Sequence, residues 1–142
     1  MKVNVAWQGN MTMVGTNSRN HTTRFDTVAQ YGGDDSGPTP MEALLEALAA
    51  CSMLDVVSIL RKKRVEFEEL NVQVEGERSE KHPKVFTKVR MIYSLTSETA
   101  DIKDLERSIE LSHGSYCSVS AMFRAAGCVV THDSEVVKNP NV

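Results

Sequence analysis

Two cysteines in this chain could carry redox chemistry. Cys51 lies in the apolar segment GPTPMEALLEALAACSMLDVVSILRKKR, Cys117 lies in LSHGSYCSVSAMFRAAG, and both segments show helical patterning. A thiolate is a strong nucleophile, and two thiols in contact can cycle between a dithiol and a disulfide. The functional question is therefore whether the fold brings these two sulfur atoms together.

Each cysteine also has a purely structural interpretation, because most free cysteines behave as small buried hydrophobes. Cys51 lies about three turns inside its predicted helix, where the helix dipole gives no help in ionising a thiol. Cys117 lies at the predicted N-terminal end of a helix, where free amide N–H groups lower the pKa of a thiol. Local physics thus favours Cys117 as the nucleophile. Cys128 starts a predicted strand and is expected to be plain core.

A metal site and a hydrolase site are the rival uses of cysteine. The chain has no Cys-x-x-Cys pair, and its four histidines are scattered without ligand spacing to a cysteine. We therefore predict neither a metal nor a cofactor. A Cys–His hydrolase would also need an oxyanion hole and an orienting carboxylate, which no local motif supplies.

Length and composition narrow the class of protein. The 142 residues fit a single domain spanning 1–142, and a formal net charge of −3 argues against nucleic acid as a partner. The N-terminus has no apolar signal segment, so we expect a cytoplasmic protein with reduced thiols. The longest apolar stretch is interrupted by Glu42, Glu46 and Asp55, and we expect it to be too polar for a membrane span.

The long helix that must position Cys51 has a clear start. Thr39 fits the N-cap, Pro40 the first helical position and Glu42 the third, which together predict a capping box. The helix should continue to about Arg64. Its first half is apolar almost all round, which predicts that it crosses the core of a domain or of a dimer. Asp55, one turn after Cys51, is either a buried, paired carboxylate or the start of an exposed half.

The remaining pattern predicts an α+β fold. Alternating apolar residues indicate two long antiparallel strands in the middle of the chain. The expected elements are strands at 2–8, 11–16 and 22–28, a loop at 30–37, strands at 70–77 and 86–95, helices at 101–112 and 117–126, and a final strand at 128–137.

Taken together and in order, four motifs resemble the OsmC/Ohr family, the osmotically induced and organic hydroperoxide resistance proteins. The resemblance extends over essentially the whole chain and is strongest to the OsmC-like subgroup with Asp-Val-Val-Ser-Ile-Leu after the first cysteine. The motifs are Thr39-Pro40-Met41-Glu42, Ala49-Ala50-Cys51, Glu77…His82-Pro83…Phe86 and Tyr116-Cys117-Ser118-Val119.

The resemblance implies an OsmC-like fold of strongly bent antiparallel sheets around long central helices. It also implies an intertwined homodimer in which both subunits build each site. Such a dimer would cover the apolar surface of the long helix, which a small monomer could hardly bury.

The resemblance further implies thiol peroxidase chemistry with an organic hydroperoxide, and possibly hydrogen peroxide, as substrate in oxidative-stress defence. Cys51 would be the peroxidatic residue and would become a sulfenic acid, and Cys117 would resolve it as a disulfide. A dithiol reductant, dihydrolipoyl in the best-known members, would regenerate the thiols. This assignment of roles is the reverse of the one that local physics favours, in which Cys117 is the nucleophile.

The residues that would activate Cys51 depart from the family pattern. In the peroxidases a glutamate directly after the helix-start proline pairs with an arginine of the N-terminal loop, which contacts the thiolate. Here Met41 follows the proline and Glu42 comes one place later, a shift that rotates a helical side chain by about 100°. Arg19 or Arg24 would be the arginine, and Glu42 its partner. Non-enzymatic binding of a small apolar ligand and redox sensing are the alternative functions.

Overall fold

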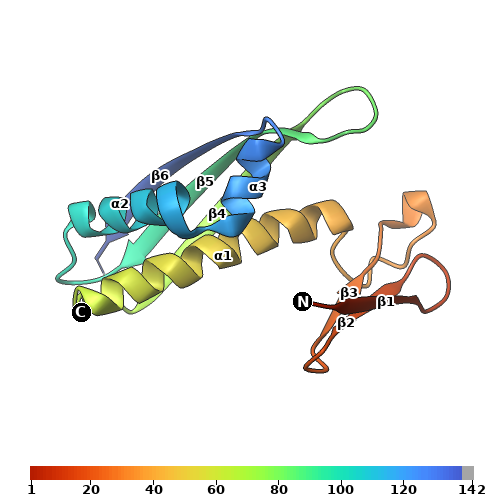
Figure 1. Cartoon of the computed structure of the whole chain (residues 1–142), viewed down its shortest axis with the longest axis horizontal. Coiled ribbons are helices and arrows are strands. Elements are labelled where there is room, and N and C mark those ends of the chain that lie inside the picture. Colours follow the sequence, from red (N-terminus) through yellow and green to blue (C-terminus); the bar gives the residue numbers. More distant parts are fainter. Residues whose placement is uncertain (139–142) are drawn as a thin grey trace. The chain divides into compact units, whose positions relative to one another are not determined.

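The computed structural model describes residues 1–138, and the chain forms two compact units, Met1–Leu44 and Leu45–Val142. Figure 1 shows their helices and strands in chain order. The composition of these elements is α+β, as predicted. A single domain spanning the whole chain stays a prediction.

The first unit contains a small antiparallel sheet in the order β1-β2-β3. Its strands are β1 (Val3–Trp7), β2 (Met13–Asn17) and β3 (Thr22–Phe25). Gly9 and Asn10 both have positive φ, 99° and 48°, in the turn that joins the first two strands. The three predicted strands are confirmed, and the third ends at Phe25, before the predicted Val28.

A buried carboxylate organises the loop that follows this sheet. Asp26 is 2% exposed and accepts hydrogen bonds from the Ser36 hydroxyl and from the amides of Thr27, Asp34 and Ser36. These bonds lower the pKa of Asp26 to about 2, and the bond from the Ser36 hydroxyl has the largest effect. The predicted loop is confirmed, and it contains one 3-10 turn, Ala29–Tyr31.

The long helix α1 (Pro40–Lys62) begins with the predicted capping box. The amide of Glu42 donates to Thr39 Oγ1 at 3.3 Å, and Glu42 Oε2 accepts from the Thr39 amide at 2.7 Å. The helix ends two residues before the predicted Arg64, which has a left-handed φ of 59°. Local sequence therefore sets both ends of this helix to within two residues.

The second unit contains a mixed sheet in the order β4-β5-β6. β4 (Glu69–Arg78) and β5 (Phe86–Thr96) pair antiparallel, as predicted, whereas β6 (Val129–Val137) pairs parallel to β5. The expectation of purely antiparallel sheets is therefore wrong for this edge. The helical crossover between β5 and β6 reverses the chain and makes the parallel pairing possible.

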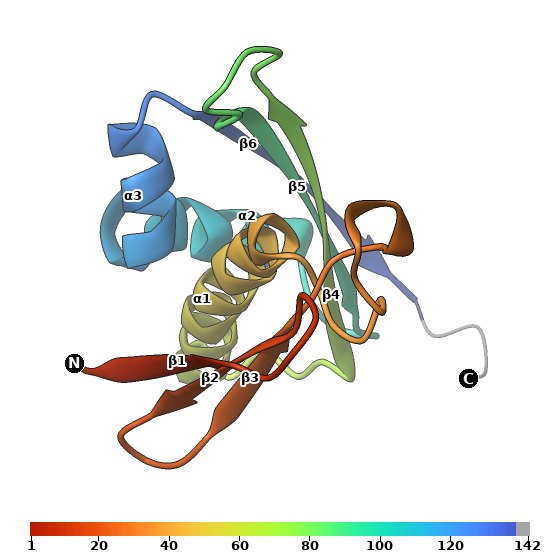
Figure 2. The same cartoon turned by 90° about the vertical axis from the view of Figure 1, so that its right-hand side faces the viewer.

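That crossover consists of three consecutive helical segments. They are α2 (Ile102–Leu111), a π-helical turn η2 (Ser112–Tyr116) and α3 (Ser118–Ala125). Cys117 is the N-cap of α3, and Gly127, with a φ of 83°, follows its C-terminal end. Figures 1 and 2 show α2, α3 and the main part of α1 on one face of the sheet.

The core of the second unit lies between this face and the helices. Val89, Met91, Tyr93 and Leu95 alternate along β5 and are fully buried. Positions four residues apart on α1 form the facing stripe, which consists of Leu48, Ser52, Val56 and Leu60. Burial on most sides of α1 is not observed in the single chain, because Leu54 is 74% exposed.

By length and hydropathy, α1 could cross a membrane, with a mean hydropathy of 1.9 over its most apolar window. The expectation that this stretch is too polar is therefore wrong by that measure. One such helix is weak support for a membrane span, because the core helix of a soluble protein passes the same test. The polar Ser52 in its buried stripe is hydrogen-bonded within the chain.

Candidate functional site

The fold brings the thiols of Cys51 and Cys117 together. The two side chains lie close enough for Cys51 to affect the ionisation of Cys117, and both thiols are free. Cys117 is 3% exposed, while Cys51, on α1, is partly exposed. Neighbouring thiols are the arrangement that disulfide redox chemistry requires.

The environment of Cys117 opposes its ionisation. Burial is the largest cause that raises the pKa of this thiol to about 11, and the hydrogen bond with Cys51 and the charges of Cys51 and Asp55 add to the increase. The Ser120 amide donates to Cys117 Sγ at 3.3 Å and acts in the opposite direction. The local expectation of a lowered pKa at this helix N-terminus is therefore wrong, because desolvation outweighs the amide.

Burial and the neighbouring Cys51 act on Cys117 in the same direction. Both raise the pKa of Cys117, so this thiol keeps its proton at pH 7. Cys117 is therefore available as a protonated thiol beside Cys51.

A line of buried hydroxyl groups leads away from the thiols, beginning at Asp55. Ser112 Oγ donates to Asp55 Oδ2 at 2.9 Å and lies 3.0 Å from Ser52 Oγ. Ser52 Oγ in turn lies 2.6 Å from the Tyr93 hydroxyl. Asp55 is half-buried and hydrogen-bonded, which identifies it as a paired carboxylate.

The same line continues from Tyr93 to a cation. The Tyr93 hydroxyl lies 2.9 Å from His113 Nε2, and His113 Nδ1 lies 2.9 Å from Ser120 Oγ. Arg124 Nη1 donates to Ser120 Oγ at 2.8 Å. Burial is the largest cause that lowers the pKa of His113 to about 4, and the charges of His132 and Arg124 add to the decrease. The ring is therefore neutral at pH 7.

Sequence reasoning missed most of this network. Polar residues at core positions were the available signal, since buried hydroxyl groups need partners. Ser52 interrupts an apolar helix stripe, and Tyr93 alternates with Met91 and Leu95 on the buried face of β5. The partners themselves come from α1, β5, η2 and α3, and no local pattern connects those segments.

A small pocket opens beside the site. Its volume is about 240 Å³, and it has one acidic, one basic and several apolar wall residues. The lining residues are Asp55, Ser58, Ile59, Lys62, Leu111 and Tyr116. Asp55 therefore accepts a hydrogen bond from the hydroxyl network and also lines an accessible pocket. Tyr116, the residue before Cys117, lines the same pocket.

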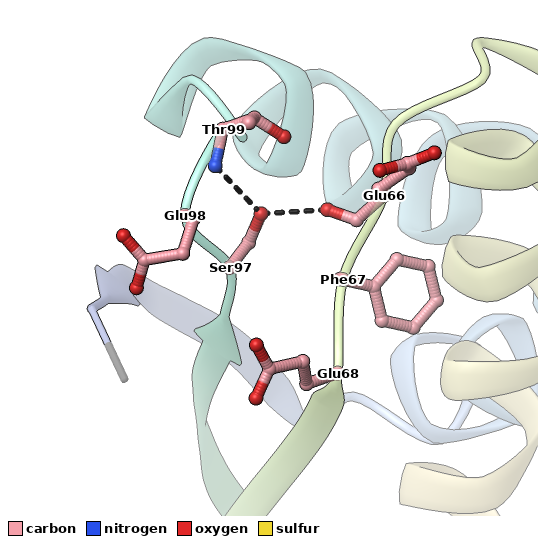
Figure 3. Close-up of a pocket in the computed structure, with 6 residues that line it drawn as sticks. All are labelled: Glu66, Phe67, Glu68, Ser97, Glu98 and Thr99. Carbon is pink, nitrogen blue, oxygen red and sulfur yellow. Dashed lines mark hydrogen bonds between the residues drawn. The ribbon is translucent and has the colours of Figure 1, made fainter. Parts of the chain in front are cut away.

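A second hollow, of about 380 Å³, lies where the α1–β4 connection meets the end of β5 (Figure 3). Ser97 Oγ connects two of its lining segments by hydrogen bonds. It donates to the Glu66 carbonyl at 2.6 Å and accepts from the Thr99 amide at 3.2 Å. Its three glutamates do not converge on one point (Figure 3). The six residues that line it include no thiol or histidine, so this hollow holds no group for thiol chemistry.

The other predicted site residues belong to the first unit. Arg19 is exposed in the β2–β3 turn, where its amide donates to Asn17 Oδ1, and Arg24 lies on β3. The Glu42 carboxylate accepts from the Thr39 hydroxyl and amide, which lower its pKa. An approach of Arg19, Arg24 or Glu42 to Cys51 stays a prediction.

The remaining candidates are Cys128, a metal site and the histidines. Cys128 is 4% exposed, which confirms the prediction that it is core, and burial raises its pKa. Within residues 1–138, no group of three or more His, Cys, Asp or Glu residues could hold a metal ion. His113, one of the four scattered histidines, is part of the buried network.

Residues 33–133 match the family described as OsmC-like protein. Protein YhfA of Escherichia coli K12 is 35% identical over 139 residues, which cover 96% of this chain and 98% of that protein. A hypothetical protein from Aquifex aeolicus VF5 has a similar crystal structure, with a TM-score of 0.83, 30% identity and coverage of 97% of this chain and 96% of that chain.

More distant structures share the fold. An organic hydroperoxide resistance protein OsmC from Legionella pneumophila has a TM-score of 0.70 and 14% identity, with coverage of 96% of this chain and 98% of that chain. The organic hydroperoxide resistance protein OhrB of Bacillus subtilis has a TM-score of 0.60 and 19% identity, with the same coverage.

Proposed function

Because the chain belongs to the OsmC-like protein family, we propose that it is a thiol-dependent peroxidase that reduces organic hydroperoxides. The proposal assigns the redox chemistry to Cys51 and Cys117. It is supported by two structural relatives, which are organic hydroperoxide resistance proteins. The observation that carries it is the proximity of the two free thiols.

The proposed cycle has three steps. The Cys51 thiolate attacks the hydroperoxide, the O–O bond breaks, and Cys51 becomes a sulfenic acid, while the alkoxide takes up the proton that Cys51 released and leaves as an alcohol. The Cys117 sulfur then attacks the Cys51 sulfur, which forms a disulfide and releases water. A dithiol reductant, such as a lipoyl protein, restores both thiols by exchange and is itself oxidised to a disulfide.

The raised pKa of Cys117 supports this division of roles. A resolving thiol that stays protonated does not compete with Cys51 for the hydroperoxide, because the thiolate is the nucleophile. The proximity of the side chains also supports this division of roles, because a sulfenic acid on Cys51 would form beside Cys117. Rapid formation of the disulfide would protect that intermediate from further oxidation.

We further propose that the protein works as a cytoplasmic homodimer, with Arg19 and Glu42 assisting the ionisation of Cys51. The exposed Leu54 on α1 supports a partner surface. Met41 stands where the family's peroxidases carry their glutamate, and Glu42 is already hydrogen-bonded to Thr39. This departure predicts a slower Cys51 than in those peroxidases.

Turnover of cumene hydroperoxide with a dithiol reductant such as dihydrolipoamide tests the proposal. We expect catalytic peroxide consumption by the wild-type protein and by Cys128→Ser, and loss of turnover in Cys51→Ser and Cys117→Ser. Circular dichroism spectra of all variants check that they remain folded. Equal turnover in wild type and Cys51→Ser would contradict the proposed function.

A further inference from the structure

The hydrogen-bond line between Asp55 and Arg124 has a fixed direction. An ionised carboxylate only accepts hydrogen bonds, and a guanidinium only donates them. Ser112 donates to Asp55 Oδ2, and Arg124 donates to Ser120 Oγ. Every hydroxyl proton between these two charged ends is therefore assigned by elimination.

The assignment begins at the carboxylate. Because Ser112 gives its proton to Asp55, it must accept from Ser52, and Ser52 must then accept from the Tyr93 hydroxyl. With its proton used, the Tyr93 oxygen accepts from His113 Nε2, which therefore carries the ring proton.

The cation at the other end fits the same tautomer. Because the neutral ring carries its proton on Nε2, Nδ1 accepts the Ser120 proton, and the Ser120 oxygen accepts from Arg124. The carboxylate end thus requires neutral His113 with its proton on Nε2, and the cation end accommodates it. The low pKa of this buried ring agrees with that state. The line holds one orientation, with its accepting end at Asp55.

The accepting end lies next to the thiols. Asp55 follows Cys51 by four residues on α1, so the two side chains are neighbours on one helix face. Ser112 links Asp55 to Cys117 as well, because its carbonyl accepts the Cys117 amide at 2.8 Å while its hydroxyl donates to Asp55. Asp55 also contributes to the electrostatic environment of Cys117 and Tyr93.

Disulfide formation requires a proton acceptor at this place. Once Cys51 is a sulfenic acid, it no longer carries the negative charge, and Cys117 must lose its proton in order to attack. Burial holds that proton on sulfur. Solvent hydroxide is scarce at pH 7 and has poor access to a thiol that is 3% exposed.

We propose that Asp55 accepts the proton of Cys117 during disulfide formation, and that the line from Ser112 to Arg124 positions the Asp55 carboxylate for this transfer. This inference rests on the proposed peroxidase function. The S–H proton moves to Asp55, the Cys117 sulfur bonds to the Cys51 sulfur, and the S–O bond breaks. The leaving hydroxide takes the proton back from Asp55 and departs as water, so Asp55 ends as it began.

The pocket of about 240 Å³ gives this water an exit. Asp55 forms part of its wall, and Tyr116, the residue before Cys117, forms another part. Lys62 is the cation on the same wall and can balance the Asp55 charge when the carboxylate is ionised. The pocket thus gives the Asp55 residue access to solvent, while the network holds its carboxylate through Ser112.

Asp55→Asn tests the proton transfer directly. After one equivalent of cumene hydroperoxide, dimedone trapping measures the Cys51 sulfenic acid, and peptide mass spectrometry measures the disulfide over time. We expect Asp55→Asn to form the sulfenic acid but to close the disulfide about 100-fold more slowly at pH 7, which is a typical loss of a general base. Its closure rate should rise with pH as hydroxide replaces Asp55. Glu46→Gln, which removes an exposed carboxylate from the same helix, should close at the wild-type rate.

The outcomes separate this inference from the proposed function. Wild-type closure rates and an unchanged pH profile in Asp55→Asn would overturn the role of Asp55 and leave the peroxidase proposal standing. Absence of sulfenic acid and of disulfide in the folded wild-type protein would instead overturn the peroxidase proposal.

Arg124→Met tests the positioning line. We expect its closure rate at pH 7 to fall and its pH profile to shift toward that of Asp55→Asn, with Arg124→Lys, which keeps a donor, restoring much of the rate. Nitrogen-15 NMR of histidine should show His113 protonated on Nε2 in the wild type. A wild-type pH profile in Arg124→Met, or a wild-type His113 protonated on Nδ1, would contradict the positioning role.

Discussion

Burial decides which of the two thiols keeps its proton. Cys117 has the position that normally favours a thiolate, at the N-cap of α3 with the Ser120 amide on its sulfur. Its side chain is nevertheless almost wholly buried beside Cys51, and its pKa rises. The residue that local sequence favours as the nucleophile is therefore the better resolving group.

His113 makes stability depend on pH in a defined window. Its folded-state pKa of about 4 lies below the ordinary 6.5, so the unfolded state binds more protons between these values. The free energy of unfolding should therefore fall as pH is lowered from about 6.5 to about 4, by on the order of 3 kcal/mol from this group. Urea unfolding at fixed protein concentration measures it.

The matched variants isolate the contribution of this ring. His113→Gln should flatten the pH dependence in that window, and His21→Gln, which changes an exposed histidine, should leave it as in the wild type. An equally steep dependence in His113→Gln would assign the effect to other groups. Asp26 acts in a lower pH window, which extends from its ordinary pKa of 3.8 down to its folded-state pKa of about 2.

At the residue level, the sequence predicted the participants of the thiol pair but not their surroundings. Cys51 and Cys117 stand out by residue type, and the resemblance paired them. The buried partners Ser52, Tyr93 and Ser112 are ordinary residues whose role appears only when α1, β5 and η2 meet. A hydrogen bond between distant segments has no local signature, which is why this part could not be predicted.

At the scale of elements, local signals predicted most helices and strands. The capping box at Thr39 and the Asp101 N-cap set two helix starts, and alternation along β5 marked its buried face. The parallel pairing of β6 with β5 was missed, because strand direction depends on the path of the crossover and not on the pattern of the strand.

Gly76 provides a test of packing between β4 and β5. A Cβ atom there would lie 2.6 Å from Phe86 Cε1 and 3.2 Å from Leu45 Cδ1. The Phe86 ring is stacked on Phe123 at a centroid distance of 5.8 Å and cannot easily move away. We expect Gly76→Ala to lower the free energy of unfolding by about 1–3 kcal/mol.

Gly114→Ala is the matched control in the same unit. A Cβ atom at Gly114 would meet nothing within 4 Å, so the substitution should change stability by no more than about 0.5 kcal/mol. Urea unfolding of both variants measures the difference. Equal stability of Gly76→Ala and the wild type would show that the Phe86 ring can be displaced at little cost.

At the scale of the whole molecule, α1 has two different faces. One stripe, from Leu48 to Leu60, is buried within the chain, while Leu54 projects with 74% of its surface exposed. The apolar pattern of the helix predicted burial on most sides, and a single chain covers only part of it. A homodimer would supply the remaining cover.

Sedimentation analysis tests the dimer. We expect the wild type, and Leu54→Met as the apolar control, to sediment at twice the chain mass of 15.7 kDa. Leu54→Asp would place a charge in the contact and should shift the protein toward the monomer mass. A wild-type protein that stays monomeric at micromolar concentration would contradict the proposed assembly.

The most direct test of the central claim is the covalent state of the two thiols after peroxide. The folded, fully reduced protein is treated with one equivalent of cumene hydroperoxide, and its peptides are mapped by mass spectrometry without reductant. The account predicts a disulfide between Cys51 and Cys117, with Cys128 still a free thiol. Recovery of Cys51 and Cys117 as unmodified thiols would contradict it.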